Sequence, residues 1–446
     1  MTVAIMRTKA EQAFLDSFET VAKELPGSGW VAKLRRDALA DFARQGLPGR
    51  RVEAYKYTDL RERVKLTSAP LAEHLRAESN RLYAEPSDSS DAASITFLNG
   101  RFHKSRFGET AGHGRDFHFD PLAKVIGADP PAWLHAHFAD AAQRQPSAIA
   151  ALNTAHMSDG VVMRIEPGAH LATPVAWSFV STSEQPLATA VRNLVRVGAG
   201  ARVTLIETHF GPNSGTRLAN AVTDLVIEDG AEVEHIQHIQ AGAAATHLGI
   251  TNVTLGAGAT YRAVGLTLDT ALARHDVNVT FAGPGAKLDL AGLVLGRRAE
   301  HIDQTLVIDH AVPGCHSREL FKCVLDGRAR GIVQGKVIVR PGAQKTDGKQ
   351  MAQALMLSPD AEFDSKPELE IYADDVVCGH GSTCAEIDAG MIFYLMARGI
   401  PRPAARALLI ESFIGEALDK VRDENLRNSL IAIAHAWLRA AENGGT

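Results

Sequence analysis

The 446-residue chain lacks several features that mark common protein classes. It has no run of about 18 apolar residues, so we expect no membrane span, and its first residues lack the apolar stretch and cleavage site of a secretory signal. A formal charge of −5 provides no basic field for nucleic acid. We therefore expect a cytoplasmic protein that binds neither a membrane nor nucleic acid.

Cysteine is scarce as well, and the cysteines form no CxxC pair, which argues against a closed zinc finger. Because thiols stay reduced in the cytoplasm, we expect free thiols or metal ligands rather than disulfides. The sequence also lacks the GxxxxGK[ST] motif of nucleotide-binding P-loops and the GxSxG motif of serine hydrolases. The four cysteines are Cys315, Cys323, Cys378 and Cys384.

Helical periodicity is confined to the two ends of the chain. Apolar spacing predicts helices over about 9–25, over about 30–45 and between 131 and 156. A hairpin is expected over 95–102, and a Ser-, Asp- and Pro-rich loop over 85–93. After residue 388 the pattern predicts three more helices. Residues 46–60 look too polar to join a core.

From about residue 160 a turn phrase, glycine followed by alanine, recurs after alternating β-type runs. Its spacing is about 30 residues, with one double interval in which Pro313-Gly314 takes the place of the missing turn. No helical pattern separates the β-type runs, so we predict a parallel β-helix. The glycines before alanine stand at positions 168, 200, 230, 258, 285 and 342.

These patterns divide the chain into three regions. Residues 1–158 form an N-terminal helical region with a small hairpin, residues 159–386 form the β-helix, and residues 387–446 form a C-terminal helical domain. A β-helix leaves two open ends, which must be capped or used for partners. The helical regions are natural caps.

The last predicted strand, which ends in CGHG at 378–381, carries the strongest candidate site. Cys378 and His380 are two residues apart, so their side chains share one face of an extended backbone. Thiolate and imidazole together suit iron–sulfur clusters, copper(I) or zinc. Cys384 has the same parity, but the intervening glycines leave its direction open. Two ligands do not complete a site, so either this chain or a partner must supply more.

Other histidines have more ordinary interpretations. His235 and His238 face opposite sides of a strand, so they cannot chelate together, and surface or stacked positions are expected. His301, His310 and His316 lie on different segments and could converge after coiling, although hydrogen bonding to a turn is favoured over ligation. Cys323, in an apolar run, is expected to be a small core residue.

Several phrases resemble the SufD group of the SufB/SufD family of iron–sulfur cluster assembly proteins. They include RRVEAYKYTDL at 50–60, ITFLNGRF at 95–102 and AALNTA at 150–155. The block SRELFKCVLDGRARGIVQGKVIVRP at 317–341, with QKTD at 344–347, is specific to the family. The Cys-x-His-Gly phrase at 378–381 matches the SufD group rather than SufB, which has a Glu-His-Glu-Ala type phrase there.

The resemblance implies a right-handed parallel β-helix between helical ends. It implies a non-catalytic scaffold that pairs with SufB through the β-helix and shares a transient iron–sulfur cluster or iron at that interface, with none tightly bound in the isolated chain. His380 is then the functional residue of this subunit, with Cys378 beside it. The SufC ATPase would dock on the C-terminal helices, at the phrase RALLIESF that holds Arg406, Leu408, Leu409 and Phe413.

Two other interpretations remain open. A cytosolic β-helix enzyme that acts on a polysaccharide would need a cluster of catalytic acids along a groove of the coil. A SufB-like homodimer that builds clusters alone is disfavoured by the Cys-x-His-Gly phrase, although the isolated chain could still self-associate.

Overall fold

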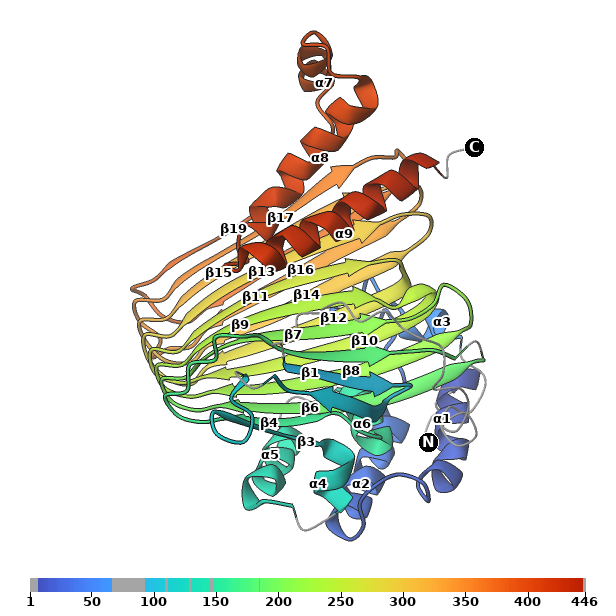
Figure 1. The fold of residues 1–446 in the computed structure, drawn as a ribbon, viewed down its shortest axis with the longest axis vertical. Helices are drawn as coiled ribbons and strands as arrows, with labels where there is room; N and C mark the ends of the chain where they lie inside the picture. The colour runs from blue at the N-terminus through green and yellow to red at the C-terminus, as the bar shows by residue number, and fades with distance from the viewer. Residues whose placement is uncertain are drawn as a thin grey trace.

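The computed structural model describes residues 7–65, 93–108, 111–127, 130–143, 147–183 and 185–443. Its centre is a long coil of strands that alternate between two sheets (Figure 1). The ten-stranded sheet contains β1 (Ala93–Leu98), β2 (Arg101–Arg106), β5 (Val175–Val180), β7 (Arg202–Phe210), β9 (Glu232–Gln240), β11 (Thr260–Leu268), β13 (Lys287–Gly296), β15 (His316–Leu325), β17 (Asp347–Met356) and β19 (Val377–Glu386). The nine-stranded sheet contains β3 (Phe117–Pro121), β4 (Val161–Ile165), β6 (Leu187–Val197), β8 (Arg217–Ile227), β10 (Gly242–Leu255), β12 (Thr270–Phe281), β14 (His301–His310), β16 (Arg330–Val339) and β18 (Glu362–Ile371).

From β4 onward each strand pairs in parallel with the strand two places later in the chain, as in β7 with β9 and β16 with β18. The predicted parallel β-helix is therefore confirmed. The predicted hairpin is present as the antiparallel pair β1–β2, which extends the ten-stranded sheet beyond β5. Asn99 and Gly100 turn it with φ values of 50° and 78°, the left-handed backbone that Asn-Gly favours. The loop expected over 85–93 lies outside the described residues, except for its last residue.

The glycine-alanine phrases form a stack of turns. For the turn glycines from Gly168 to Gly314, the N–H of each donates to a carbonyl of the next turn, beginning with Gly168 to Ala199 at 2.8 Å and ending with Gly314 to Gln344 at 2.9 Å. Gly314 has a φ of 72°, so Pro313-Gly314 supplies the missing turn as predicted. The residue after each glycine is buried, and at this turn it is Cys315 instead of alanine. Cys315 is thus a packing residue of the turn stack.

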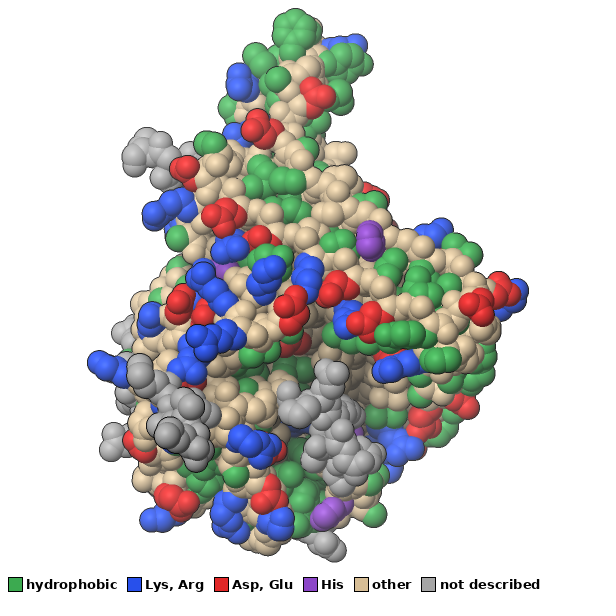
Figure 2. Space-filling view, turned by 180° about the vertical axis from the view of Figure 1, so that it is seen from behind, with side chains coloured by type: hydrophobic (Ala, Val, Ile, Leu, Met, Phe, Trp, Pro, Cys, Tyr) green, Lys and Arg blue, Asp and Glu red, His purple; other side chains and the backbone are tan. Residues whose placement is uncertain are grey.

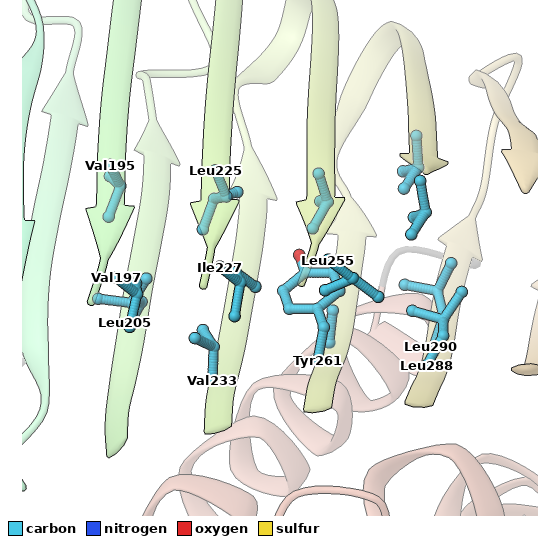
Figure 3. Packing of buried hydrophobic residues seen from close by; sticks show 14 of the residues in the cluster. Val195, Val197, Leu205, Leu225, Ile227, Val233, Leu255, Tyr261, Leu288 and Leu290 are labelled. Atoms are coloured by element: carbon cyan, nitrogen blue, oxygen red, sulfur yellow. The ribbon is translucent and has the colours of Figure 1, made fainter. Parts of the chain in front are cut away.

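Side chains from both sheets meet in a narrow apolar core (Figure 3). Val197, Ile227 and Leu255 stand in register on successive strands of the nine-stranded sheet. Val233 and Tyr261 stand in register opposite them, on the ten-stranded sheet. Full burial of such an aliphatic side chain contributes about 1.5–3 kcal/mol. Because the pairing keeps its register, the core consists of columns of side chains that run along the coil.

The described residues before β4 form seven short helices, which lie at one end and along one side of the coil (Figure 1). The prediction of a single helix between 131 and 156 is wrong, because the described part of this region contains two helices, Ala132–Gln143 and Ala148–His156. The second helix begins at Ala148, where the Ser147 hydroxyl accepts a hydrogen bond from the Ala150 N–H at 3.2 Å. The helices are α1 (Lys9–Val21), α2 (Trp30–Gln45), η1 (Glu53–Tyr55), α3 (Leu60–Arg63), α4 (Leu122–Gly127), α5 (Ala132–Gln143) and α6 (Ala148–His156).

In the described chain after β19, the helices are α7 (Ala389–Met396), α8 (Arg402–Leu418) and α9 (Glu424–Asn443). Ile414 and Leu418 of α8 and Trp437 of α9 pack on the outer face of the ten-stranded sheet, against residues such as Leu266 and Leu293. By contrast, α7 and the start of α8 project from the coil as an arm (Figure 1). No helix in the described part of the chain is long and apolar enough to cross a membrane.

The segment 46–60, expected to stay outside the core, is in fact docked on the nine-stranded sheet. Tyr55 is 8% exposed and Thr58 is fully buried. The Arg274 guanidinium lies 3.9 Å from the Tyr55 ring centroid and 2.6 Å from an Asp303 carboxylate oxygen. The Thr58 hydroxyl donates to the same carboxylate at 2.5 Å. The polar residues of this segment therefore attach the N-terminal helices to the coil through a buried ion pair.

Replacing Asp303 by alanine should destabilise the protein, because it removes one of the two carboxylates that pair with the buried Arg274 guanidinium, the other being Asp276 at 2.8 Å, and it also removes the acceptor of the Thr58 hydroxyl. Removal of one partner from a buried pair costs about 3–5 kcal/mol. Urea unfolding would measure the loss. The control is Asp309→Ala, which breaks an exposed pair with Arg340 at 3.0 Å and should cost less than about 1 kcal/mol. Equal losses would contradict the role given to Asp303.

Candidate functional site

The candidate ligands lie on β19, the terminal strand of the ten-stranded sheet, which in the described part of the chain pairs only with β17. The pairing is unbroken from Val377 to Glu386, so Gly379 and Gly381 introduce no bend. Cys378, His380 and Cys384 therefore occupy the same face of the strand. The direction of Cys384, which the sequence left open, is settled by this register.

This shared face is the one that, deeper in the coil, points into the core. His380 is in register with Gln350, and Gln350 with Glu319. Cys384 is likewise in register with Ala354, and Ala354 with Cys323. These deeper residues are buried, whereas His380 and Cys384 are exposed and Cys378 is half-buried. Core-facing positions thus become accessible at the last turn, since no further described strand covers them.

Exposed apolar side chains surround this end of the coil. Tyr372 is 59% exposed and Val377 is 62% exposed, and Ile371 and Met351 are also exposed. Monomeric proteins rarely leave such a group of large apolar side chains in water unless it forms an interaction site. The end of the β-helix therefore combines potential metal ligands with a surface suited to a protein partner.

The thiols of this end are protonated at neutral pH in the isolated chain. Burial raises the pKa of Cys378 and of Cys384 above the ordinary value of a thiol. A cation or metal ion beside such a thiol favours the thiolate, which is the form that binds metal. Among the described residues, no group of three or more His, Cys, Asp or Glu side chains is placed to hold a metal ion. Cys378 and His380 therefore form at most a partial metal site within this chain.

Behind His380 lies a carboxylate that the sequence analysis did not single out. Glu319 is 3% exposed, and neither of its carboxylate oxygens has a partner within hydrogen-bonding geometry in the described structure. Burial raises the pKa of Glu319 to about 8, although the nearby Ser317 hydroxyl and Arg318 guanidinium oppose the shift. The parity of the strand could have revealed this residue, because Glu319 lies two positions from each of the core residues Ser317 and Phe321 and therefore on the same face of the strand.

The other histidines do not converge on a metal site. His301 lies 2.9 Å from the Thr58 hydroxyl, and His310 lies 3.1 Å from the Ser317 hydroxyl and stacks on Phe281. His235 and His238 are buried, so neither lies on the surface. Cys323 is fully buried, as predicted, and burial raises its pKa to about 12.

The residues predicted to bind a partner lie on α8, but their exposure differs. Arg406 and Leu408 are exposed on the projecting part of the helix. Leu409 and Phe413 are partly buried, and the Phe413 ring centroid lies 4.4 Å from the Lys322 ammonium. The tip of the arm presents further hydrophobic side chains (Figure 2). On α7 these are Met391, Phe393, Tyr394 and Met396.

Comparison with known proteins agrees with this architecture. Residues 179–413 match the family described as "SUF system FeS cluster assembly, SufBD core domain", and residues 8–176 match the "SufBD protein N-terminal region". The chain belongs to the SufBD family. Family membership thus accounts for both the coil and the helices that precede it.

Among the relatives of this SufBD protein is the iron–sulfur cluster assembly protein SufD of Escherichia coli, which is 26% identical over 88% of this chain and 90% of the relative. A SufBD family protein of Synechocystis is 31% identical over 63% of this chain and 64% of the relative. The SufD of Plasmodium falciparum is 29% identical over 53% of this chain, but that region is only 16% of the much longer relative.

Thiol reactivity should divide the four cysteines of this SufBD protein into two pairs. A thiol reagent should modify Cys378 and Cys384 in the native chain, and Cys315 and Cys323 only after unfolding, because the latter pair is buried. Counting thiols with a chromogenic disulfide before and after denaturant would measure this. Cys384→Ser should lower the native count by one. Rapid modification of all four in the native chain would contradict the packing described here.

The stability of the protein should depend on the ionisation of Glu319. Because its folded-state pKa is raised from 4.5 to about 8, the native chain retains a proton that the unfolded chain releases above its ordinary pKa. The associated stability is therefore lost as pH rises toward 8. Glu319→Gln has no ionisable group at this position. The melting temperature of this variant minus that of the wild type should therefore increase between about pH 5 and pH 8. A difference that stays constant with pH would contradict this.

Proposed function

We propose that this SufBD protein is a non-catalytic scaffold subunit of a SufB–SufC–SufD iron–sulfur cluster assembly complex. It supplies Cys378 and His380 as part of a nascent-cluster or iron site at the interface with SufB. The observation that carries the proposal is the soft ligand pair on the uncovered terminal turn. Two ligands suffice if the partner provides the others, and SufB is expected to provide the main thiolate.

The end of the coil favours a protein partner at this position. The exposed apolar group around β19 offers a contact surface. Among the described strands, β19 is the edge of its sheet, so its outer backbone groups are available for a further strand. A second β-helix with a similar end would satisfy both. The same features would allow the isolated chain to form a homodimer when SufB is absent.

The arm formed by α7 and the start of α8 is proposed to dock the SufC ATPase. Its tip is apolar and exposed, whereas the far end of α8 is fixed to the coil. ATP-driven dimerisation of two SufC subunits would then change the relative orientation of SufB and this chain and expose buried ligands. Such a change requires different contacts with the open and closed SufC pair. ATP hydrolysis belongs to SufC in this proposal.

Co-expression with SufB and SufC tests the metal site directly. His380→Ala should leave the complex intact on size exclusion but lower cluster absorption after anaerobic isolation. Mutation of second-shell partners of a metal typically costs about 10–100-fold in affinity, and removal of a ligand should cost at least as much.

The matched control is His103→Ala, an exposed histidine on β2 at the opposite end of the same sheet. It should leave the cluster content unchanged. Normal cluster content in His380→Ala would overturn the proposal and reduce this chain to a structural support. Normal cluster content together with cleavage of a polysaccharide by the purified chain would favour the enzymatic alternative.

If the arm docks SufC, a substitution on the arm should remove SufC from the complex without removing SufB. Leu408→Glu places a charge on an exposed apolar position, so SufC should be lost from the purified complex while SufB is retained. The matched control is Ser412→Glu, which adds the same charge at an exposed position of α8 nearer the coil. Retention of SufC by the Leu408→Glu complex would contradict the assignment of the arm.

A further inference from the structure

A cavity of about 40 Å³ lies between the two sheets near the N-terminal end of the coil, at the opposite end from β19. Its walls come from β5, β6, β7, β8 and β10 and from the Asn99–Gly100 turn of the hairpin. Because one water molecule needs roughly 10–15 Å³ of such space, the cavity has room for about three water molecules or for one ligand of similar size.

The cavity arises from small side chains in the register of the nine-stranded sheet. Ala219 of β8 is in register with Thr189 of β6 on one side and with His247 of β10 on the other. Two positions earlier on the same face of β8, Arg217 is in register with Ala245 of β10. The two alanines leave space that larger core-facing residues would fill. Three polar side chains therefore border a space whose floor is Ala219.

Arg217 brings a buried positive charge to this cavity. It is 4% exposed, and its terminal guanidinium nitrogens donate to the backbone carbonyls of Pro212, Ser214 and Ala241. None of the described carboxylates forms an ion pair with it, whereas the buried Arg192 pairs with a carboxylate at 2.6 Å. The Arg217 Nε–H has no acceptor in the described structure. A buried charge without a counter-ion is costly, so the cavity beside it favours an anion.

Two more lining residues have a buried polar atom that lacks a partner among the described residues, namely His247 at Nδ1 and Ser181 at its hydroxyl. Most buried polar atoms in native proteins are hydrogen-bonded, and an exception requires an explanation such as an unplaced water molecule or ion. None of the described lining residues is acidic. The Glu207 carboxylate, outside the lining, is engaged by His209 Nε2 at 2.9 Å and by the Thr223 hydroxyl at 3.1 Å.

We propose that this cavity binds one small monovalent anion with an apolar body, of the size of a short-chain carboxylate. Its charged end is held by Arg217, with the Ser181 hydroxyl and the His247 imidazole as further donors. Its apolar end packs on Phe179 and Val191, which belong to the largely apolar remainder of the lining. Mostly apolar walls with a few polar groups that fix the orientation are typical of small-molecule sites. The site is independent of the function proposed for Cys378 and His380.

Acetate is the probe for this site, and acetamide is a neutral molecule of the same size. The purified full-length chain is titrated with each at constant ionic strength, and saturation transfer to the ligand methyl protons measures binding. Acetate should bind saturably in roughly the millimolar range, as suits a ligand of about four non-hydrogen atoms. Acetamide should bind at least about tenfold more weakly, because hydrogen bonds to a charged group are the stronger ones.

Two variants locate the binding. Ala219→Leu fills the cavity and should abolish the acetate signal. Ser181→Ala removes only the unpartnered hydroxyl, so it should weaken acetate binding roughly tenfold while the melting temperature without acetate stays that of the wild type. These variants leave Arg217 in place, because Arg217 also holds the loop carbonyls and its removal would disturb the loop.

The matched control is Ser178→Ala, on the opposite face of β5, where the Ser178 hydroxyl accepts a hydrogen bond from the Thr208 hydroxyl at 2.7 Å. It should bind acetate as the wild type does. Equal binding of acetate and acetamide would overturn the anion site, because the cavity would then not select charge. Unchanged acetate binding by Ala219→Leu would show adventitious binding elsewhere only. No acetate binding by the wild type would show that the cavity holds water only.

Discussion

Strict register between successive turns is the constraint on which this structure depends. Each parallel pair places a residue directly above its counterpart one turn earlier, and the turn glycines repeat the same hydrogen bond along the stack. A side chain that faces the core in one turn therefore faces the core in every turn. The site arises from this rule and from the end of the repeat, because at β19 the core-facing positions are left without a covering turn.

Polar groups recur along these columns. Behind Glu319, the column that leads to His380 contains Leu290 and Ala263, and behind them the buried His235, whose Nδ1 lies 3.0 Å from the Tyr261 hydroxyl. Nearer the end it contains Glu319 and Gln350. Burial of a carboxylate is costly, and at this depth the cost appears as the raised pKa of Glu319.

Much of the fold could be predicted from the sequence because its local signals repeat. The turn phrases gave the period of the coil, and Pro313-Gly314 filled the one gap correctly. Helix spacing located the C-terminal helices. The docking of residues 46–60 could not be predicted, because the partners of Tyr55 and Thr58 lie more than 200 positions away and the burial of Arg274 depends on them.

The candidate site was predicted only in part, for a related reason. Strand parity placed Cys378 and His380 on one face without knowledge of the fold. The pairing with β17 was needed to orient Cys384, and the depth of Glu319 was needed to distinguish it from an ordinary surface acid. Parity relates residues along one strand, whereas these facts depend on which strands lie above and below.

The attachment of α8 gives the arm the mechanics of a lever. The helix has 17 residues, so it is about 25 Å long at 1.5 Å per residue. Its inner half rests on β13 and β15, and the Lys322 ammonium of β15 lies 2.6 Å from the Glu416 carboxylate of α8. A force on the free tip therefore acts as a torque on β15, the strand that carries Glu319 and Cys323. A displacement of the tip would therefore be transmitted along one continuous helix to β15.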